Sequence, residues 1–94
     1  MREGVTMYTI EMIYDPYGVE LVRIAQLNFI PVEGMAFLFA DPEGMGTSHE
    51  VSYVMYDMLK GDFSVTFEPR PGRNHEDEFR RYGFVERDQV VTNA

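Results

Sequence analysis

The stretch from Ser48 to Gly61, SHEVSYVMYDMLKG, decides the fold class of this chain. As a helix, it begins with a capping box at residues 47–50 and has five apolar residues at helical spacing: Val51, Val54, Met55, Met58 and Leu59. As a strand, it alternates over residues 51–56 and then turns at residues 58–62. β-Branched and aromatic side chains favour extended backbone, and a strand here can pair with the next extended segment. We therefore expect a strand, with a helix over residues 48–60 as the alternative.

The segments on both sides of this stretch also have strand character. Residues 7–14 place Tyr8, Ile10, Met12 and Tyr14 on one face, and residues 19–30 form a second extended run. Residues 35–40 are apolar on both faces, and residues 63–67 alternate between apolar and polar. Proline and glycine residues separate these runs, as is typical of turns. The pattern predicts a meander of five or six antiparallel strands.

The two-sided apolar character of residues 35–40 and 51–56 calls for a cover on both faces. A single antiparallel sheet with one face in water alternates between apolar and polar residues, and these two segments do not. Closure of the sheet removes exposed apolar surface and exposed strand edges together. We therefore expect a mainly β fold curled into a small SH3-like barrel, with an α+β fold, helical over residues 48–60, as the alternative.

The C-terminal segment predicts a short helix over residues 74–83. Asn74 can cap it, acidic residues occupy its first turn, and Arg80 and Arg81 lie in its last turn, an order that suits the helix dipole. Gly83 ends it, and Phe79 and Tyr82 face inward as a lid. Residues 85–91 add a final short strand. The length fits one domain over residues 1–94, with residues 1–6 disordered and residues 92–94 frayed.

The chain has 8 basic and 16 acidic residues, which gives a formal net charge of −8. Most of the arginines lie in residues 70–94, where acidic and basic residues balance. An acidic surface repels phosphate groups, so we expect no nucleic-acid partner and no membrane partner. The charges serve solubility in one interpretation; in a second, the arginine-bearing tail docks on acidic residues of the body or of a neighbour. Mimicry of nucleic acid by the acidic surface is a remote alternative.

The chain has no Cys, which excludes disulfides, thiolate zinc sites and a cysteine nucleophile. No apolar run approaches the roughly 20 residues of a membrane-spanning helix, and the N-terminus shows no apolar signal segment. These features predict a cytoplasmic protein.

No motif assigns a catalytic residue or a cofactor. The glycine-containing segment at residues 44–48 lacks the lysine and the spacing of a phosphate-binding loop, so we interpret it as a connection. His75 and Glu78 share a helix face at i, i+3, as a zinc site needs, but no H-E-x-x-H pattern supports one. We interpret His49 and His75 as solvated polar residues and expect no metal ligand. Glu11 and Glu20 lie among apolar residues of the first two strands and can face each other.

Methionine and aromatic residues dominate the apolar set, with seven Met, seven Phe and six Tyr. These adaptable, large side chains are enriched at protein interfaces. The predicted interface residues are Phe37, Phe39, Tyr53, Tyr56, Phe79 and Tyr82. We therefore expect a non-enzymatic interaction or accessory protein that acts as a homodimer, the commonest closed assembly. The alternatives are a small-molecule-binding module and a small acid–base enzyme.

Overall fold

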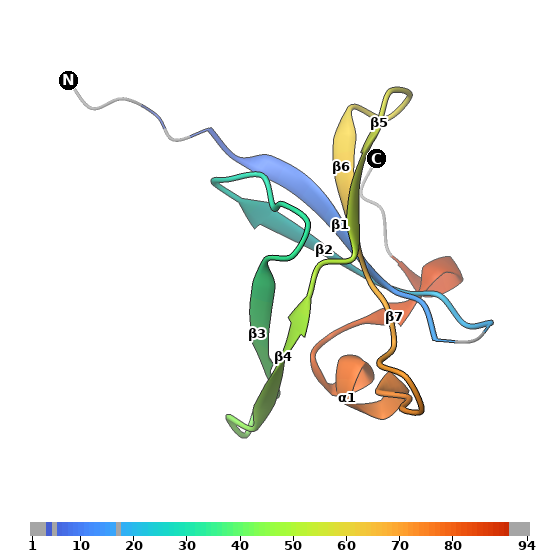
Figure 1. Cartoon of the computed structure of the whole chain (residues 1–94). Helices are drawn as coiled ribbons and strands as arrows, with labels where there is room; N and C mark the ends of the chain where they lie inside the picture. The colour runs from blue at the N-terminus through green and yellow to red at the C-terminus, as the bar shows by residue number, and fades with distance from the viewer. Residues whose placement is uncertain (1–3, 5, 17, 91–94) are drawn as a thin grey trace.

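Residues 48–50 and 53–57 are strand and residues 58–61 are a turn, so the helical alternative over residues 48–60 is wrong. The strand predicted over residues 51–56 from the β-branched and aromatic side chains is present from Tyr53 onward. The computed structural model describes residue 4 and residues 6–16 and 18–90. Its elements, labelled in Figure 1, are β1 (Tyr8–Tyr14), β2 (Leu21–Leu27), β3 (Ala36–Ala40), β4 (Gly46–Glu50), β5 (Tyr53–Asp57), β6 (Asp62–Phe67), α1 (Glu76–Arg81) and β7 (Val85–Glu86). A single turn of 3-10 helix follows over Arg87–Gln89. The described chain is therefore mainly β.

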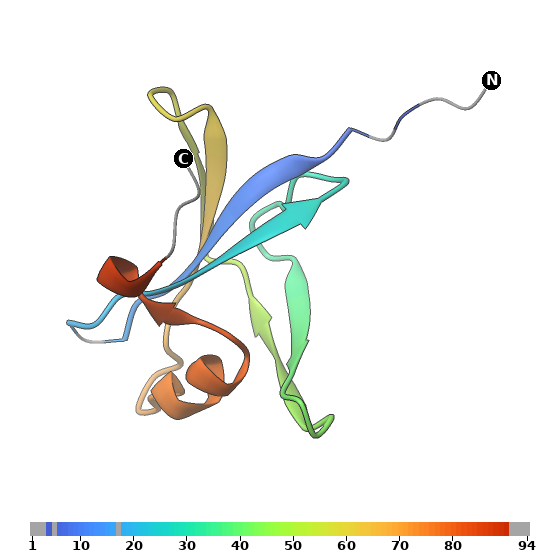
Figure 2. The same ribbon diagram turned by 180° about the vertical axis from the view of Figure 1, so that it is seen from behind.

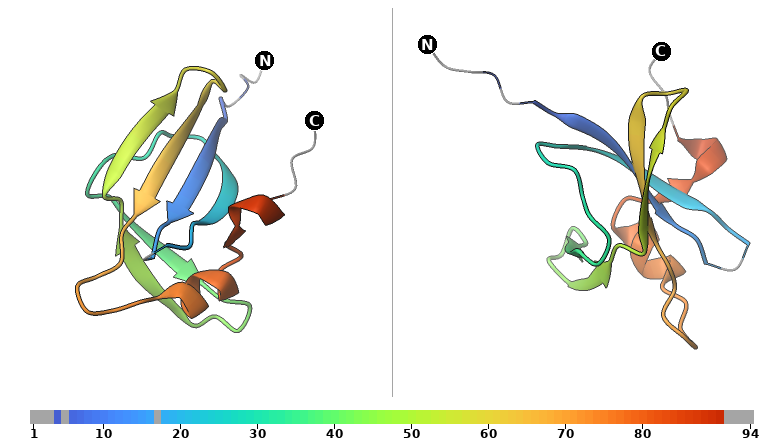
Figure 3. Two further views of the ribbon diagram at one scale, coloured as in Figure 1. Left: turned by 90° about the vertical axis from the view of Figure 1, so that its right-hand side faces the viewer. Right: turned by 45° about the horizontal axis from the view of Figure 1, so that its top comes forward.

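The strands form two sheets, one of five strands in the order β5-β6-β1-β2-β7 and one of two strands, β3 and β4. β1 lies at the centre of the larger sheet, as Figure 3 shows. It pairs antiparallel with β2 and parallel with β6. The β1–β2, β3–β4 and β5–β6 pairs are hairpins between consecutive strands, as a meander predicts, but the parallel β1–β6 pairing is not part of a meander.

The predicted closure into an SH3-like barrel is wrong, because the five-stranded sheet is not closed. The parallel pairing with β6 places β1 in the middle and leaves β5 and β7 at opposite edges. β3 and β4, which a barrel would need in its wall, pair only with each other among the described strands. As a result, the second apolar face of residues 35–40 is not covered, and Leu38 is 78% exposed.

The core lies against one face of the five-stranded sheet. The register of β1 and β6 aligns their apolar residues on the same face of the sheet. These residues are Ile10, Met12, Tyr14, Phe63, Val65 and Phe67. This is the face that the alternation of residues 7–14 predicts. The β3–β4 hairpin and α1 pack at the same end of this sheet (Figures 1 and 2) and complete the core with Phe39, Val51, Phe79, Tyr82 and Phe84.

The turn between β3 and β4 spans residues 41–45, so the interpretation of residues 44–48 as a connection is confirmed for Gly44 and Met45 only. The carboxylate of Asp41 accepts hydrogen bonds from the backbone N–H groups of Glu43 and Met45, at 2.9 and 3.0 Å. Gly44 adopts a φ of 88°, a conformation that favours glycine. Gly46, Thr47 and Ser48 then belong to β4 and not to the loop.

The helix α1 is shorter than the predicted range 74–83 but ends as predicted. Asn74 Oδ1 accepts a hydrogen bond from the backbone N–H of Glu76 at 2.8 Å. At the other end, Gly83 has a φ of 92°, and the N–H of Phe84 donates to the carbonyl of Phe79 at 3.0 Å. These contacts form a Schellman motif, in which a left-handed residue turns the chain back over the last helical turn. The motif directs Phe84 onto Phe79, with ring centroids 4.8 Å apart.

Phe79 is the centre of an aromatic cluster that joins α1 to both sheets. Its ring stacks on Tyr14 of β1, with centroids 4.0 Å apart and an interplanar angle of 6°. It also lies 5.5 Å from Phe39 of β3 and 4.7 Å from the His49 ring of β4. Phe79 is fully buried and Tyr82 nearly so, which agrees with the inward orientation predicted for them.

The termini add little regular structure. The strand predicted over residues 85–91 is reduced to β7 (Val85–Glu86), followed by the 3-10 turn. The disorder predicted for residues 1–6 concerns mostly residues outside the described ones, and the fraying predicted for residues 92–94 falls entirely outside them. In the described part of the chain, no helix has both the length and the apolar character to cross a membrane.

Truncation of Phe79 tests the role of this cluster. Phe79→Ala removes a fully buried ring, and such changes lower the free energy of unfolding by about 3–5 kcal/mol. Phe29→Ala, the matched control, removes a ring that is 41% exposed, and we expect a loss of about 1 kcal/mol or less. Urea unfolding followed by circular dichroism measures both values. Equal losses in the two variants would contradict the central role of Phe79.

Candidate functional site

A cluster of polar side chains lies buried between β4 and α1. Thr47 and His49 are two residues apart on β4, so their side chains lie on the same face of the strand, opposite Phe39 and Phe37 in register. His75 immediately precedes α1. The side chains of Glu78 and Tyr82 reach the cluster from α1 and its C-cap. His49, His75 and Tyr82 are 3%, 6% and 6% exposed, whereas Thr47 and Glu78 are partly buried at the edge of the cluster.

The hydroxyl of Thr47 connects the members of this cluster. Its Oγ1 lies 2.9 Å from His49 Nε2, 3.0 Å from the Tyr82 hydroxyl and 3.3 Å from Glu78 Oε2. A threonine hydroxyl has one proton and two lone pairs, so three partners use its full hydrogen-bonding capacity. The cluster therefore links β4 to α1 by directed polar contacts in addition to the aromatic packing.

Two nitrogen atoms of His75 have hydrogen-bond partners and the third, Nε2, has none. Its backbone N–H donates to the Tyr14 hydroxyl at 2.8 Å, and its Nδ1 lies 2.8 Å from Glu78 Oε1. An ionised carboxylate only accepts hydrogen bonds, so Nδ1 carries a proton, and in the uncharged form of the ring Nε2 carries the lone pair. This Nε2 is buried and has no hydrogen-bond partner. A buried polar atom without a partner lowers the free energy of unfolding by about 1–3 kcal/mol. Such atoms are rare in native proteins and often have a functional role.

The environment of the cluster shifts the pKa values of two of its members. Burial, followed by the nearby His75 and Arg70, lowers the pKa of His49 from 6.5 to about 4, against the opposing effect of Glu78. The hydrogen bond from His75 lowers the pKa of the Glu78 carboxyl. His49 is thus neutral at pH 7 and Glu78 is ionised. A general base works best with a pKa near the operating pH, so this environment does not favour acid–base catalysis by His49.

The cluster also brings together residues of the types that bind metals. The donor atoms of His49, His75 and Glu78 all lie within 4.8 Å of one another. The i, i+3 spacing of His75 and Glu78 predicted that these two side chains share a face, and they are in contact. No local pattern indicates that His49 joins them, because that contact depends on how β4 packs against α1. The interpretation of both histidines as solvated residues is wrong.

The opposite face of the five-stranded sheet carries an open groove of about 530 Å³. Arg87 crosses it, and its guanidinium donates to Glu11 at 2.8 Å and to Glu20. These hydrogen bonds, first of all the one to Glu11, raise the pKa of Arg87. Glu11 and Glu20 therefore meet through Arg87. Arg81 lies 3.7 Å from Asp41, so the docking of tail arginines on acidic residues of the body is confirmed for Arg81 and Arg87.

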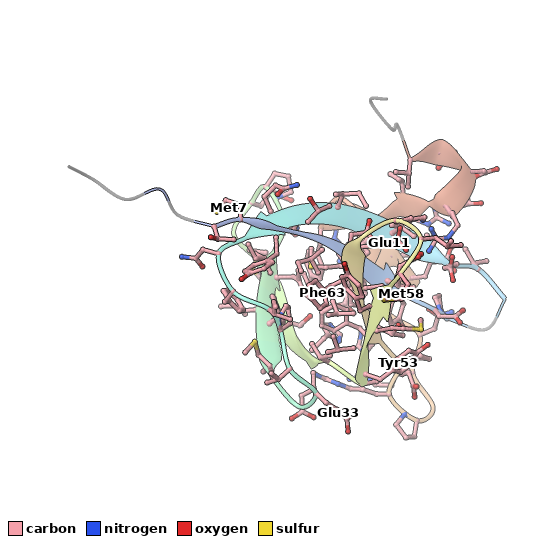
Figure 4. All side chains as sticks on the ribbon, turned by 90° about the horizontal axis from the view of Figure 1, so that it is seen from above. Met7, Glu11, Glu33, Tyr53, Met58 and Phe63 are labelled. Atoms are coloured by element: carbon pink, nitrogen blue, oxygen red, sulfur yellow. The ribbon has the colours of Figure 1, made fainter. Side chains whose placement is uncertain are left out.

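One edge of this groove is formed by the β5–β6 hairpin, which carries five exposed apolar residues. We call them the hairpin surface: Tyr53 (44% exposed), Met55 (54%), Tyr56 (47%), Met58 (84%) and Leu59 (99%). Tyr53 and Met58 lie along the β5 side of the molecule (Figure 4). The six predicted interface residues thus separate into two groups. Tyr53 and Tyr56 are exposed and Phe37 is partly buried, whereas Phe39, Phe79 and Tyr82 are buried in the core of their own chain.

The chain was compared with models of protein families, with curated proteins and with solved structures. No match was found. The functional assignment therefore depends on the geometry described above, in which the hairpin surface and the buried cluster are the two features that the fold itself does not require.

The lowered pKa of His49 predicts how stability depends on pH. The unfolded chain binds a proton at His49 with a pKa near 6.5, and the folded chain only near 4. Protonation of His49 therefore favours the unfolded chain. The free energy of unfolding is unaffected by His49 above about pH 6.5 and falls as the pH falls toward 4, by about 3 kcal/mol in total for this shift. Urea unfolding between pH 7.5 and 4.5, in the presence of a chelator, measures the loss.

His49→Gln is the matched variant for this measurement, because glutamine is neutral throughout and places an amide near the position of Nε2. We expect a flatter dependence of the free energy of unfolding on pH in this variant. Parallel curves for the two proteins would show that His49 does not titrate with a lowered pKa.

Proposed function

We propose that this protein is a small, non-enzymatic interaction protein that acts as a homodimer through the hairpin surface. The observation that carries the proposal is the exposure of five apolar side chains on a single hairpin, two of them almost completely. Single exposed apolar residues are ordinary on protein surfaces, whereas several close together mark an interaction site. Tyr53 and Met55 share one face of β5, and Met58 and Leu59 follow in the turn. Tyrosine and methionine are also among the residues enriched at interfaces.

The position of β5 in the sheet supports a second copy of the chain as the partner. Among the described strands, β5 has one neighbour, β6, so its other side is an open edge of the sheet. An open edge pairs readily with another strand through backbone hydrogen bonds. Two antiparallel copies of one strand fit a twofold axis, the commonest symmetry of homo-oligomers. With all five residues of β5 paired, Met55 lies opposite Met55 of the second copy.

The turn at the end of the hairpin supports the same proposal, because it holds its apolar residues outward. The Asp57 carboxylate accepts hydrogen bonds from the backbone N–H groups of Leu59 and Lys60, at 2.8 and 3.1 Å. These contacts lower the pKa of the Asp57 carboxyl, and Gly61 closes the turn with a φ of 74°. The exposure of Met58 and Leu59 is therefore built into the turn. A rigid turn loses little conformational entropy when a partner binds.

As part of this proposal, we place the protein in the cytoplasm, because a chain with no Cys forms no disulfides and does not need an oxidising compartment to fold.

The open groove beside the hairpin favours the second candidate function, the binding of a small molecule. Its carboxylates and the aromatic rings of Tyr53 and Tyr56 suit a cationic ligand with an apolar body. This groove lies next to the proposed dimer contact, so the two functions are compatible.

Light scattering after size-exclusion chromatography tests the dimer. We expect twice the monomer mass, with a larger dimer fraction at high salt, because salt screens the repulsion between two chains of charge −8. Met55→Lys places two positive charges opposite each other at the proposed contact, and we expect at least a tenfold weaker dimer, which corresponds to about 1.4 kcal/mol.

Leu38→Lys is the control for this experiment, since Leu38 is also apolar and is more exposed than Met55 (78% against 54%) but belongs to β3. It makes the same change of charge outside the hairpin surface, and we expect it to remain a dimer. A wild-type monomer at high salt, or equal weakening by both variants, would overturn the homodimer. A monomer would leave the groove as the candidate functional surface.

A further inference from the structure

We propose that His49, His75 and Glu78 form a binding site for a divalent transition-metal ion of the Zn²⁺ type. Two imidazoles and one carboxylate offer donor atoms within 4.8 Å of one another. A second, independent observation points to a ligand at this place. His75 is 6% exposed, and its Nε2 is buried without any hydrogen-bond partner. A bound ion provides the missing partner.

The distances are compatible with a metal site after a small contraction. Bonds from zinc to histidine nitrogen and to carboxylate oxygen are about 2.0–2.2 Å, so the donor atoms around a tetrahedral ion lie about 3.3–3.5 Å apart. All three donors are side-chain atoms within 4.8 Å of one another, so rotation about side-chain bonds can supply the contraction. Rotation of the His75 ring by 180° about χ2 exchanges Nδ1 with Cδ2 and Nε2 with Cε1, which brings Nε2 to the side of the ring on which Nδ1 lies. Water or a neighbouring hydroxyl then completes four ligands.

The chemistry of the donors selects the class of metal. Imidazole nitrogens bind Zn²⁺, Cu²⁺ and Ni²⁺, whereas Mg²⁺ and Ca²⁺ prefer sites made of oxygen. A metal ligand must have a free lone pair, and each imidazole ring offers one in its uncharged form. The ionised Glu78 supplies negative charge to the ion. The site is therefore suited to a transition metal and poorly suited to an alkaline-earth ion.

The surroundings of the site provide access and second contacts. His49 lines one surface hollow, together with Glu50 and Arg70, and Glu78 lines another, together with Thr47 and Tyr82. An ion can reach the donors from either hollow through side-chain motion. The hydroxyls of Thr47 and Tyr82 lie 3.0 Å apart and support the ligands by hydrogen bonds, as groups around metal ligands commonly do. Bound metal would connect β4 of the smaller sheet directly to α1.

The test uses the 94-residue chain, freed of metal with a chelator and titrated with Zn²⁺. The chain has two histidines, so NMR of the imidazole nitrogens gives two sets of signals that report only on this site. We expect both sets to shift and to saturate at one ion per chain, together with a rise in Tm. Mg²⁺ at the same concentration should produce neither effect. Unshifted imidazole signals in the presence of Zn²⁺ would overturn the proposal without any variant.

Variants then assign the ligands. His75→Gln and Glu78→Gln each remove one donor. Loss of a group that only supports a metal ligand lowers metal affinity roughly 10- to 100-fold, so we expect loss of a ligand itself to lower the affinity for Zn²⁺ by at least as much. Glu76→Gln is the matched control, because it changes a carboxylate of the same helix that pairs with Arg80 outside the cluster. We expect its affinity to equal that of the wild type. Equal loss in Glu76→Gln, or full affinity in His75→Gln, would assign Zn²⁺ to surface carboxylates and overturn the site.

Discussion

The contact between Tyr14 and the start of α1 determines how the rest of the molecule is arranged. Tyr14 is the last residue of the central strand, its ring stacks on Phe79, and its hydroxyl accepts the backbone N–H of His75. One side chain thus fixes both the distance and the rotation of the helix relative to the sheet. Because α1 has six residues, it is too short to be stable alone and depends on such tertiary contacts. The β3–β4 hairpin then packs on the surface that the helix and sheet form together.

The buried polar cluster is a consequence of that arrangement, and it is unusual for so small a core. A short chain buries a smaller fraction of its unfolded surface than a long one, so each buried polar group without a partner costs a larger share of its stability. Most members of the cluster satisfy one another through the Thr47 hydroxyl, and His75 Nε2 is the exception. Packing alone would be served as well by apolar residues at these positions. A binding role for the histidines accounts both for their burial and for the atom that has no partner.

Local patterns predicted the local structure of this chain and failed where distant segments meet. Alternation predicted the faces of residues 7–14 and 63–67, and the order of charges with Gly83 predicted α1 and its end. No local pattern shows that residues 10–14 pair in parallel with residues 63–67, and this pairing prevents closure of the sheet. The role of His49 was missed for the same reason. Aromatic composition likewise could not separate Tyr53 from Phe79, because cores and interfaces favour the same residues.

The parallel pairing of β1 with β6 has a consequence for the order in which the chain folds during synthesis. β1 and β2 leave the ribosome first and can pair at once, but the other side of β1 has no strand to pair with until β6 has emerged. Until then the central strand exposes an unpaired edge and its apolar face. Closing so long a loop is slow compared with forming a hairpin, so this pairing sets the pace of folding. The nascent chain is therefore most exposed to aggregation and to chaperones in the interval between synthesis of β2 and synthesis of β6.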